Sequence, residues 1–488
     1  MAVAAFAIAA ALAVLPGFAS AATYTVNTTA DQAPSVGECG GAAGDCSLRQ
    51  AVDKANSVAG ADTIVVPAGR YALTIKGGGE TENGDLDVTE GGLRIEGAGA
   101  RSTVVDAAGL EDRAFDAQPS ASLTLAGLTV TGGRTEEGGG GIRGREASLA
   151  LEGVAVTGNE GFNASSGGGV YAVKGELRVV GSTISGNRDS GDGGGIAGNH
   201  ASLSLENSTL ANNVVDTSLY PGDPSWGAFG GAMEADHGGL VMKNVTISGN
   251  SIADNNGGPE EQGEGAALAD YGPFSPVEIV NTIVYGNTAS KVQRFGECSE
   301  TLTSAGHNLE GGPPSGEPRC FENATDLIAN PLLGALADNG GETETMALTA
   351  GSPAIDGGDA ARCPATDQRG VSRPQAGGCD IGAFELVPEP PAARFSIKKV
   401  RYLRSKGTAK LKLRFTGPGR LKLTGKGVRK VSRRVRAGVV FVPVKPKRAL
   451  RAVLRSRGWA KVKVKIRFVP DTGAPETKIR KLRLRLAT

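Results

Sequence analysis

One short phrase recurs six times between Leu123 and Asn287, and this repeat constrains the fold more than any other feature of the sequence. The copies read LTVTGG, VAVTGN, STISGN, STLANN, VTISGN and TIVYGN, with runs of small residues between them. Four intervals, such as Ile142 to Val156, span 14 residues and the last spans 16, whereas the rest of each period varies from 5 to 16 residues. A constant segment joined to one variable loop is typical of a stacked solenoid.

Within the constant segment, apolar and polar residues alternate, as in Leu149-Ala150-Leu151, which indicates strands with one buried face. We therefore predict a right-handed parallel β-helix. A β-sandwich with repetitive hairpins is the alternative. In a β-helix, the asparagines that end five of the copies would stack as a ladder of amides at one turn. These are Asn159, Asn187, Asn213, Asn250 and Asn287.

The charges of the chain are strongly segregated. The 488 residues contain 52 Lys and Arg against 51 Asp and Glu, a net charge of +1. Residues 391–488 hold 32 of the basic and 2 of the acidic residues, which leaves 20 basic and 49 acidic residues before them. The sequence therefore predicts an acidic body followed by a basic module.

The N-terminus and the cysteines of the chain indicate an exported protein. An apolar run, Ala4 to Leu15, precedes an Ala-Ser-Ala cleavage pattern at 19–21, which is typical of a signal peptide. A membrane anchor is the alternative, but the run is too short to span a bilayer. The mature protein should therefore be secreted or held at the cell surface, without a transmembrane span. Six cysteines allow fifteen pairings, and pairing of sequence neighbours closes three short loops: Cys39–Cys46, Cys298–Cys320 and Cys363–Cys379.

A short helix is predicted directly after Cys46. Ser47 and Gln50 form a capping box, and Leu48, Ala51, Val52 and Ala55 share one apolar face that could cover the open first coil. The segment Cys46–Ala51 resembles the CSLREA motif of exported bacterial β-helix proteins, with Gln50 in place of the motif's Glu. The following DTIVVPAGRY and GDLDV segments also resemble that family, and we expect strands at 63–66, 93–96 and 103–105.

The segment after the repeats resembles the choice-of-anchor Q domain, which closes the C-terminal end of the same class of β-helices. The similarity lies in NPLLG at 330–334, GSPAID at 351–356, DQRG at 367–370 and DIGAFE at 380–385. The resemblance implies a pectate-lyase-like architecture and export, but no reaction. Four acids here could coordinate calcium; the alternative is that they hold tight turns and pair with Arg369 and Arg373. They are Asp356, Asp359, Asp367 and Asp380.

Beyond a Pro-rich linker, alternation of apolar and basic residues predicts six or seven strands of a small immunoglobulin-like β-sandwich. The expected organisation is a signal peptide at 1–21, an N-terminal cap at 22–62, a parallel β-helix at 63–290, a closing region at 291–386, the linker at 387–393 and the basic module at 394–488. The module implies an acidic partner. Because the chain is exported and the module has few aromatic residues, we expect an acidic envelope polymer or polysaccharide and no nucleic acid. The alternative is that the charge maintains solubility or contacts the acidic β-helix.

A second candidate site comprises the two longest variable loops, 214–229 and 251–264, which should stand side by side on successive coils. Aromatic rings beside carboxylates suit sugar binding. The candidate ligand-binding residues are Tyr220, Trp226, Asp216 and His237, and the candidate catalytic acids are Asp223, Asp236 and Asp254. Glu260, Glu261 and Glu264 lie in the same loops, yet no motif selects an acid pair, and purely structural loops are the alternative.

Two hypotheses for function follow. The favoured one is a non-enzymatic exported surface protein, adhesin-like or structural, whose basic module binds acidic envelope polymers without a cofactor. The other is a carbohydrate-active enzyme, either a glycoside hydrolase that uses paired acids or a calcium-assisted polysaccharide lyase. The lyase needs a basic proton acceptor, and between Asn187 and Gly286 only Arg188 and Lys243 are basic.

Overall fold

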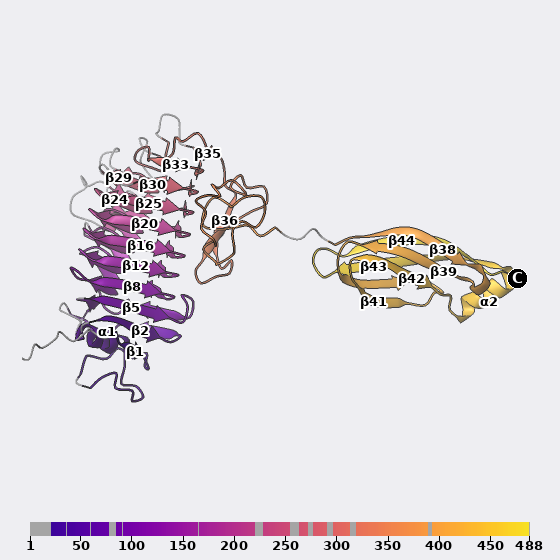
Figure 1. The fold of residues 1–488 in the computed structure, drawn as a ribbon, viewed down its shortest axis with the longest axis horizontal. Helices are drawn as coiled ribbons and strands as arrows, with labels where there is room; N and C mark the ends of the chain where they lie inside the picture. The colour runs from indigo at the N-terminus through magenta and orange to yellow at the C-terminus, as the bar shows by residue number, and fades with distance from the viewer. Residues whose placement is uncertain are drawn as a thin grey trace, which may run out of the picture. The chain divides into compact units, whose positions relative to one another are not determined.

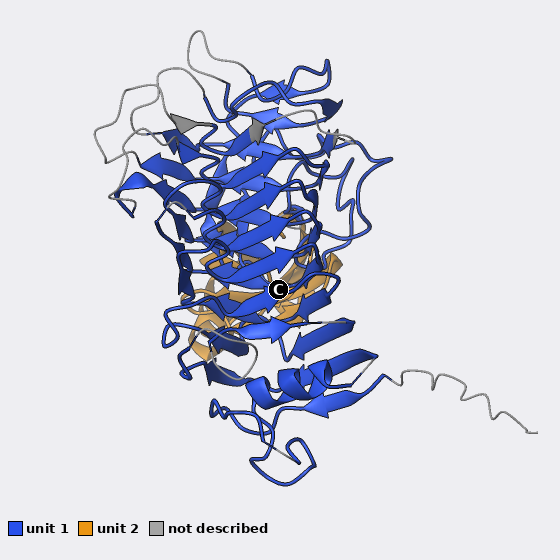
Figure 2. Ribbon diagram, turned by 90° about the vertical axis from the view of Figure 1, so that its left-hand side faces the viewer, with its two compact units in different colours: residues 1–387 blue, residues 388–488 orange. Residues whose placement is uncertain are grey.

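The computed structural model divides the chain into two compact units, Met1–Val387 and Pro388–Thr488 (Figure 2). Described residues are 21–35, 37–58, 60–77, 84–89, 91–163, 165–219, 228–253, 263–271, 277–289, 296–312, 319–388 and 393–487. The predicted signal peptide lies almost wholly outside these ranges, and so do residues 389–392 of the predicted linker.

The first unit is a parallel β-solenoid, in which strands at equivalent positions of successive coils pair in register (Figure 1). Sheet A contains β1 (Thr23–Thr25), β2 (Ala61–Val66), β5 (Gly92–Gly97), β8 (Ser122–Ala126), β12 (Ser148–Glu152), β16 (Glu176–Val180), β20 (Ser202–Glu206), β25 (Leu240–Lys243), β30 (Val277–Val280) and β33 (Ser304–Gly306). Sheet B contains β3 (Gly69–Ala72), β6 (Thr103–Asp106), β9 (Thr129–Thr131), β13 (Ala155–Thr157), β17 (Thr183–Ser185), β21 (Thr209–Ala211), β26 (Thr246–Ser248), β31 (Ile283–Tyr285), β34 (Leu309–Glu310) and β35 (Leu327–Ile328). The strands expected at 63–66, 93–96 and 103–105 are confirmed.

Two further sheets, of seven and six strands, contribute to some of the coils. Sheet C contains β4 (Leu86–Val88), β7 (Phe115–Ala117), β11 (Ile142–Arg145), β15 (Val170–Val173), β19 (Ile196–Asn199), β24 (Met233–Asp236) and β29 (Leu268–Tyr271). Sheet D contains β10 (Arg134–Thr135), β14 (Glu160–Gly161), β18 (Arg188–Asp189), β22 (Val214–Asp216), β27 (Ser251–Ala253) and β32 (Thr288–Ala289). A 3₁₀ turn (Thr217–Leu219) follows β22, and β23 (Ala228–Phe229) pairs with β28 (Gly263–Glu264).

The predicted asparagine ladder is present. The side-chain amide of Asn159 donates to Asn187 Oδ1 (2.9 Å), and the same bond links each ladder residue to the next as far as Asn287 (2.8–3.0 Å). The side chain of Asn287 in turn donates to Glu297 (2.8 Å), which ends the ladder. The residue before each ladder asparagine adopts the left-handed conformation at this turn. Glycines or Asn212 hold it, because a residue with positive φ must be Gly or a tolerant residue such as Asn.

Both ends of the apolar core are covered. The helix α1 (Leu48–Asn56) has both bonds of the predicted capping box and contributes its apolar face to the core. Arg49 is fully buried in the same helix, where it pairs with Asp31 (2.9 Å) and donates to the carbonyl oxygens of Gly84 and Asp85. At the other end, Phe321 and the Cys298–Cys320 disulfide belong to the core. All three predicted disulfides form.

Within the predicted closing region of 291–386, the part around Cys298–Cys320 covers the core, whereas residues 330–387 lie along the side of the solenoid. This segment, including β36 (Leu333–Ala337) and β37 (Thr345–Leu348), packs on the outer face of sheet B. Gln368 bridges two coils, since its amide group donates to Ser182 O (3.1 Å) and accepts from Thr209 (2.6 Å). Farther along, the Asn244 side chain donates to the carbonyl of Asp380 (3.0 Å).

The second unit consists of two antiparallel sheets that fit a β-sandwich. One contains β38 (Phe395–Leu403), β39 (Thr408–Phe415) and β42 (Gly438–Val444), and the other β41 (Val431–Val435), β40 (Gly419–Thr424), β43 (Trp459–Pro470) and β44 (Glu476–Arg485). A 3₁₀ turn (Arg404–Lys406) and the helix α2 (Arg448–Arg457) complete the unit. We did not predict α2, although the spacing of Leu450, Val453 and Leu454 is helical.

Candidate functional site

The roots of the two long loops lie side by side, as predicted, because β22 pairs with β27 and β23 pairs with β28. Tyr220, Asp223, Trp226 and Asp254 lie outside the described residues. Asp216 is buried, pairs with Arg188 and accepts hydrogen bonds from Ser218 (2.6 and 3.0 Å). The Asp216 carboxylate therefore binds neighbouring groups of the protein itself.

Asp236 and His237 line a cleft of about 400 Å³ on the outer face of sheet C. His237 contacts the Asp236 carboxylate, and its ring stacks on that of His200 with the centroids 5.1 Å apart. The other lining residues are Ser166, Tyr171, Asp192, Asn199, Phe229 and Glu234. The structure thus brings two of the predicted residues together with acids and aromatic rings that the sequence did not single out.

The carboxyl groups that line this cleft lie close together and affect one another's pKa values. Burial raises the pKa of Asp192 to about 7, and the neighbouring charge of Asp236 adds to the shift. Burial also raises the pKa of the Tyr171 hydroxyl, together with the negative charges of Glu234 and Asp192. No Lys or Arg is among the residues that line this cleft, so its described lining is acidic.

A larger cleft of about 830 Å³, which we call the acid–arginine cleft, lies over β4, β7 and β11. The Asp116 carboxylate forms a two-point ion pair with Arg143 (3.0 and 2.8 Å) and also binds Arg145 (3.0 Å). Asp85 pairs with Arg113 (3.0 Å). Sequence reasoning missed these residues as a site, although the GDLDV segment that contains Asp85 and Asp87 was recognised as resembling a family pattern.

The acids in this cleft have divergent pKa values. Burial raises the pKa of Asp85 to about 7, with the charge of Asp112 adding to the shift, and burial also raises the pKa of Asp87. Burial acts in the same direction on Asp116, but the hydrogen bonds and charge of Arg143 outweigh it and hold the Asp116 pKa below its usual range. The environments of Asp85 and Asp116 therefore push the pKa values of two neighbouring carboxyl groups in opposite directions, which is the arrangement that acid–base chemistry uses.

Asp85, Asp87 and Asp116 are also the one group of described residues whose potential metal-ligand atoms converge, within 4.8 Å of one another. Carboxylate oxygens suit a hard divalent cation. Arg113, Arg143 and Arg145 already supply positive charge at this place. The carboxylate oxygens of the three acids thus suit a divalent cation. The guanidinium groups already balance the charge of these carboxylates when no cation is bound.

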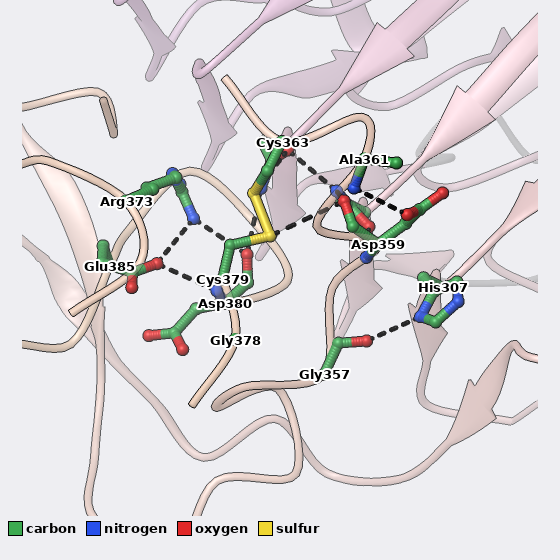
Figure 3. Close-up of a disulfide and its surroundings, with 12 residues drawn as sticks. His307, Gly357, Asp359, Ala361, Cys363, Arg373, Gly378, Cys379, Asp380 and Glu385 are labelled. Atoms are coloured by element: carbon green, nitrogen blue, oxygen red, sulfur yellow. Dashed lines mark hydrogen bonds and ion pairs between the residues drawn. A yellow bond between two sulfur atoms is a disulfide. The ribbon is translucent and has the colours of Figure 1, made fainter. Parts of the chain in front are cut away.

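The four acids considered for calcium are not gathered into such a group; each carboxylate is bound by backbone amides or an arginine, and Figure 3 shows Asp359 and Asp380 with their surroundings. Asp367 pairs with Arg369 (2.6 Å), and Asp359 accepts from the backbone of Ala361 (2.9 Å). Asp356 accepts from the backbone of Gly377 and Gly378, and Asp380 from that of Asp356 and Leu386. Arg373 pairs with Glu385 (3.0 Å) instead of one of the four acids.

The second unit presents a surface that we call the basic face, on the outer side of the sheet of β40, β41, β43 and β44. Cations lie opposite cations across its strands: Lys463 faces Lys481, Lys461 faces Arg483, and Lys422 faces Arg467. Every residue of the face is exposed. The full set is Arg420, Lys422, Arg434, Lys461, Lys463, Lys465, Arg467, Lys481, Arg483 and Arg485.

The described acids of this unit do little to neutralise the basic face. Asp471 pairs with Arg434 (2.7 Å), and Glu476 pairs with Lys478 (2.8 Å), which lies outside the face. Trp459 ends the face, with the Arg483 guanidinium 4.1 Å from its ring centroid.

No known protein family, curated protein or solved structure matches this chain. Among the described helices, none is long and apolar enough to cross a membrane. The functional argument therefore rests on the sites themselves.

Proposed function

We propose that this chain is an exported, non-enzymatic surface or extracellular protein, adhesin-like or structural, that binds acidic envelope polymers through the basic face. The proposal includes a right-handed β-helix of the CSLREA and choice-of-anchor Q type, export by a cleaved signal peptide, and an immunoglobulin-like sandwich. The β-helix type rests on the sequence resemblance, export on the apolar run before Ala19-Ser20-Ala21, and the sandwich on the alternation of apolar and basic residues.

The observation that carries the proposal is the pairing of like charges across strands. Like charges directly opposite each other destabilise a sheet, by about 0.2–1 kcal/mol per pair. The Lys463–Lys481 and Lys461–Arg483 pairs are exposed, so packing does not require them. A polyanion laid across the strands would relieve this repulsion, and regularly spaced anions along a polymer would contact several rungs at once.

Retention on an acidic polymer tests the proposal. The mature chain should bind immobilised teichoic-type polymer or polygalacturonate at low salt and be released as salt rises, because exposed charge interactions are screened. The triple variant Lys461→Gln/Lys463→Gln/Lys465→Gln should bind roughly tenfold more weakly, since three exposed ion pairs of about 0.5 kcal/mol each are lost.

A matched control separates the basic face from net charge alone. The variant Arg448→Gln/Arg451→Gln/Arg455→Gln removes three exposed charges from the helix α2, where no strand places a cation opposite another. It should retain most of the affinity. Equal losses in the two triple variants would reduce the proposal to non-specific attraction, and unchanged binding in the first would refute it.

The acid–arginine cleft supports one second candidate, a carbohydrate-active enzyme. Asp85 and Asp116 hold carboxyl oxygens within 4.8 Å of each other, and a close pair of carboxyl groups is what retaining glycosidases use. The nearby arginines also supply the basic groups that the lyase hypothesis lacked around the loops. Release of reducing ends or unsaturated uronides from a polysaccharide panel, with and without calcium, tests this candidate. Activity that disappears in Asp85→Asn would favour the enzyme over the binding protein.

A further inference from the structure

An aspartate occupies a core position of the first coil where the following coils have leucine. Asp62 lies on the buried side of β2 together with Ile64 and Val66, and it is only 3% exposed. A carboxyl group in an apolar core is costly unless hydrogen bonds or an opposite charge compensate it. The residues at the same position of the next strands of sheet A need no such compensation, because they are Leu93, Leu123, Leu149, Leu177, Leu203 and Leu240.

The group that binds Asp62 comes from the N-terminal edge of sheet A, where β1 pairs with β2. Thr23 lies opposite Thr63, so the residue before it, Ala22, lies beside Asp62. The backbone N–H of Ala22 donates to Asp62 Oδ1 (2.7 Å). The other carboxyl oxygen, Oδ2, is buried and has no hydrogen-bond partner among the described residues. A single neutral amide therefore compensates only one of the two oxygens.

Cleavage at the predicted signal-peptide site would change the chemistry of this nitrogen. Hydrolysis of the Ala21–Ala22 peptide bond by a signal peptidase consumes one water molecule, which completes the carboxyl group of Ala21 and the amino group of Ala22. The amine then takes up a proton near neutral pH, because the usual pKa of an α-amino group is about 8. An ammonium group has three N–H donors and the positive charge that a buried carboxylate requires. Ala21 is exposed, so its removal takes no side chain out of the core.

We propose that the chain is cleaved between Ala21 and Ala22, and that the new ammonium group of Ala22 forms a buried ion pair with Asp62 that holds β1 on the first coil. The inference rests on the cleaved signal peptide of the proposed function, and it adds the exact bond that is cut and a structural role for the product. The ion pair also explains why this one position of the leucine column is an acid. A chain that keeps its signal peptide has a neutral amide at this place.

Two forms of the protein with defined N-termini test the ion pair. One begins at Ala22 and the other at Ser20, each released from a cleavable fusion partner. The extension shifts the charge without displacing β1, because Ala21 already lies at the surface while Ala22 contacts Asp62. We expect the amide hydrogen of Thr63, which bonds to the Ala22 carbonyl (2.9 Å), to exchange at least roughly tenfold faster in the extended form. Tenfold corresponds to about 1.4 kcal/mol. Equal exchange in the two forms would overturn the proposal.

Variants show whether Asp62 is the partner of the ammonium group. Asp62→Leu continues the leucine column and should abolish the difference in exchange between the two forms, and Asp62→Asn should do the same with less change in shape. Glu96→Gln removes an exposed carboxylate from β5 and should preserve the difference. Circular dichroism checks that each variant is folded. A difference that survives both Asp62 substitutions, or that disappears in Glu96→Gln, would refute the ion pair.

The mass of the exported chain separates this inference from the proposed function. The full sequence is expressed in an exporting bacterial host, and the N-terminus of the product is read by mass spectrometry. A product that begins at Ala22 supports the processing site, and a product cut at another bond overturns it while leaving export intact. An uncut product would contradict the cleaved signal peptide itself. Equal exchange in the two defined forms would contradict only the ion pair.

Discussion

Identical residues are stacked in both units of this chain, with opposite energetic consequences. In the solenoid, Asn159 to Asn287 form a buried column in which each amide donates to the next. In the second unit, the exposed Lys463 and Lys481 face each other across two strands. An amide both donates and accepts, so a stack of amides satisfies itself, whereas an ammonium group only donates and repels its neighbour. The asparagine column stabilises the solenoid, whereas the unfavourable lysine pair indicates a surface that binds a partner.

The largest test concerns a buried charge in the solenoid. Arg49 and Asp31 have almost no exposed side-chain surface, so Arg49→Met leaves a carboxylate buried without its guanidinium partner. We expect a loss of about 3–5 kcal/mol of unfolding free energy. Urea unfolding of the mature chain measures it, with Arg178→Met, a half-exposed arginine on sheet A, as the control. If both substitutions lower the free energy of unfolding equally, burial of the ion pair is not the cause of the loss.

The ladder gives the next largest effect. Asn213→Ala removes the acceptor of two buried donors, the backbone and side-chain amides of Asn187. Each orphaned group costs about 1–3 kcal/mol, so we expect a loss of about 2–4 kcal/mol after local relaxation. Ser202→Ala, at an exposed position of the same coil, should change the unfolding midpoint little. A loss below that of an ordinary surface substitution would show that the ladder is not a stabilising element.

Buried acids predict an unusual pH dependence for the solenoid. Burial raises the pKa of the fully buried Asp189 to about 8. Between about pH 4, near the usual pKa of Asp, and pH 8, the folded state therefore holds a proton that the unfolded state has released. Stability should fall as pH rises through this window, by up to about 1.4 kcal/mol per pH unit for one such group, and level off above it. Asp189→Asn should reduce the difference in urea midpoint between pH 5 and pH 8; an unchanged difference would contradict this assignment.

The sequence predicted the parts of the fold that repeat and missed those that depend on contacts between distant segments. The asparagine ladder, the capping helix and the disulfides follow from spacing, because each depends on local periodicity or on neighbours in sequence. The acid–arginine cleft does not, since Asp85, Asp116 and Arg143 come from three different coils and meet only when the register is known. The same holds for residues 330–387, whose position along sheet B depends on contacts such as that of Gln368 with Ser182.

The smallest expected effect on stability comes from removing one of the two facing lysines, and it tests most directly whether stacked lysines and stacked asparagines differ in energy. Lys463→Gln removes one of two like charges that face each other, so it should stabilise the second unit slightly, by about 0.2–1 kcal/mol. The same substitution should weaken retention on an acidic polymer, because it removes a contact from the basic face. Calorimetry of the second unfolding transition and a salt series on the immobilised polymer measure the two effects. If Lys463 serves only solubility, Lys463→Gln will not weaken binding to the polymer. If Lys463 supports folding, Lys463→Gln will lower the free energy of unfolding. A higher free energy of unfolding together with weaker binding would show that Lys463 destabilises the sheet and contributes to the binding surface.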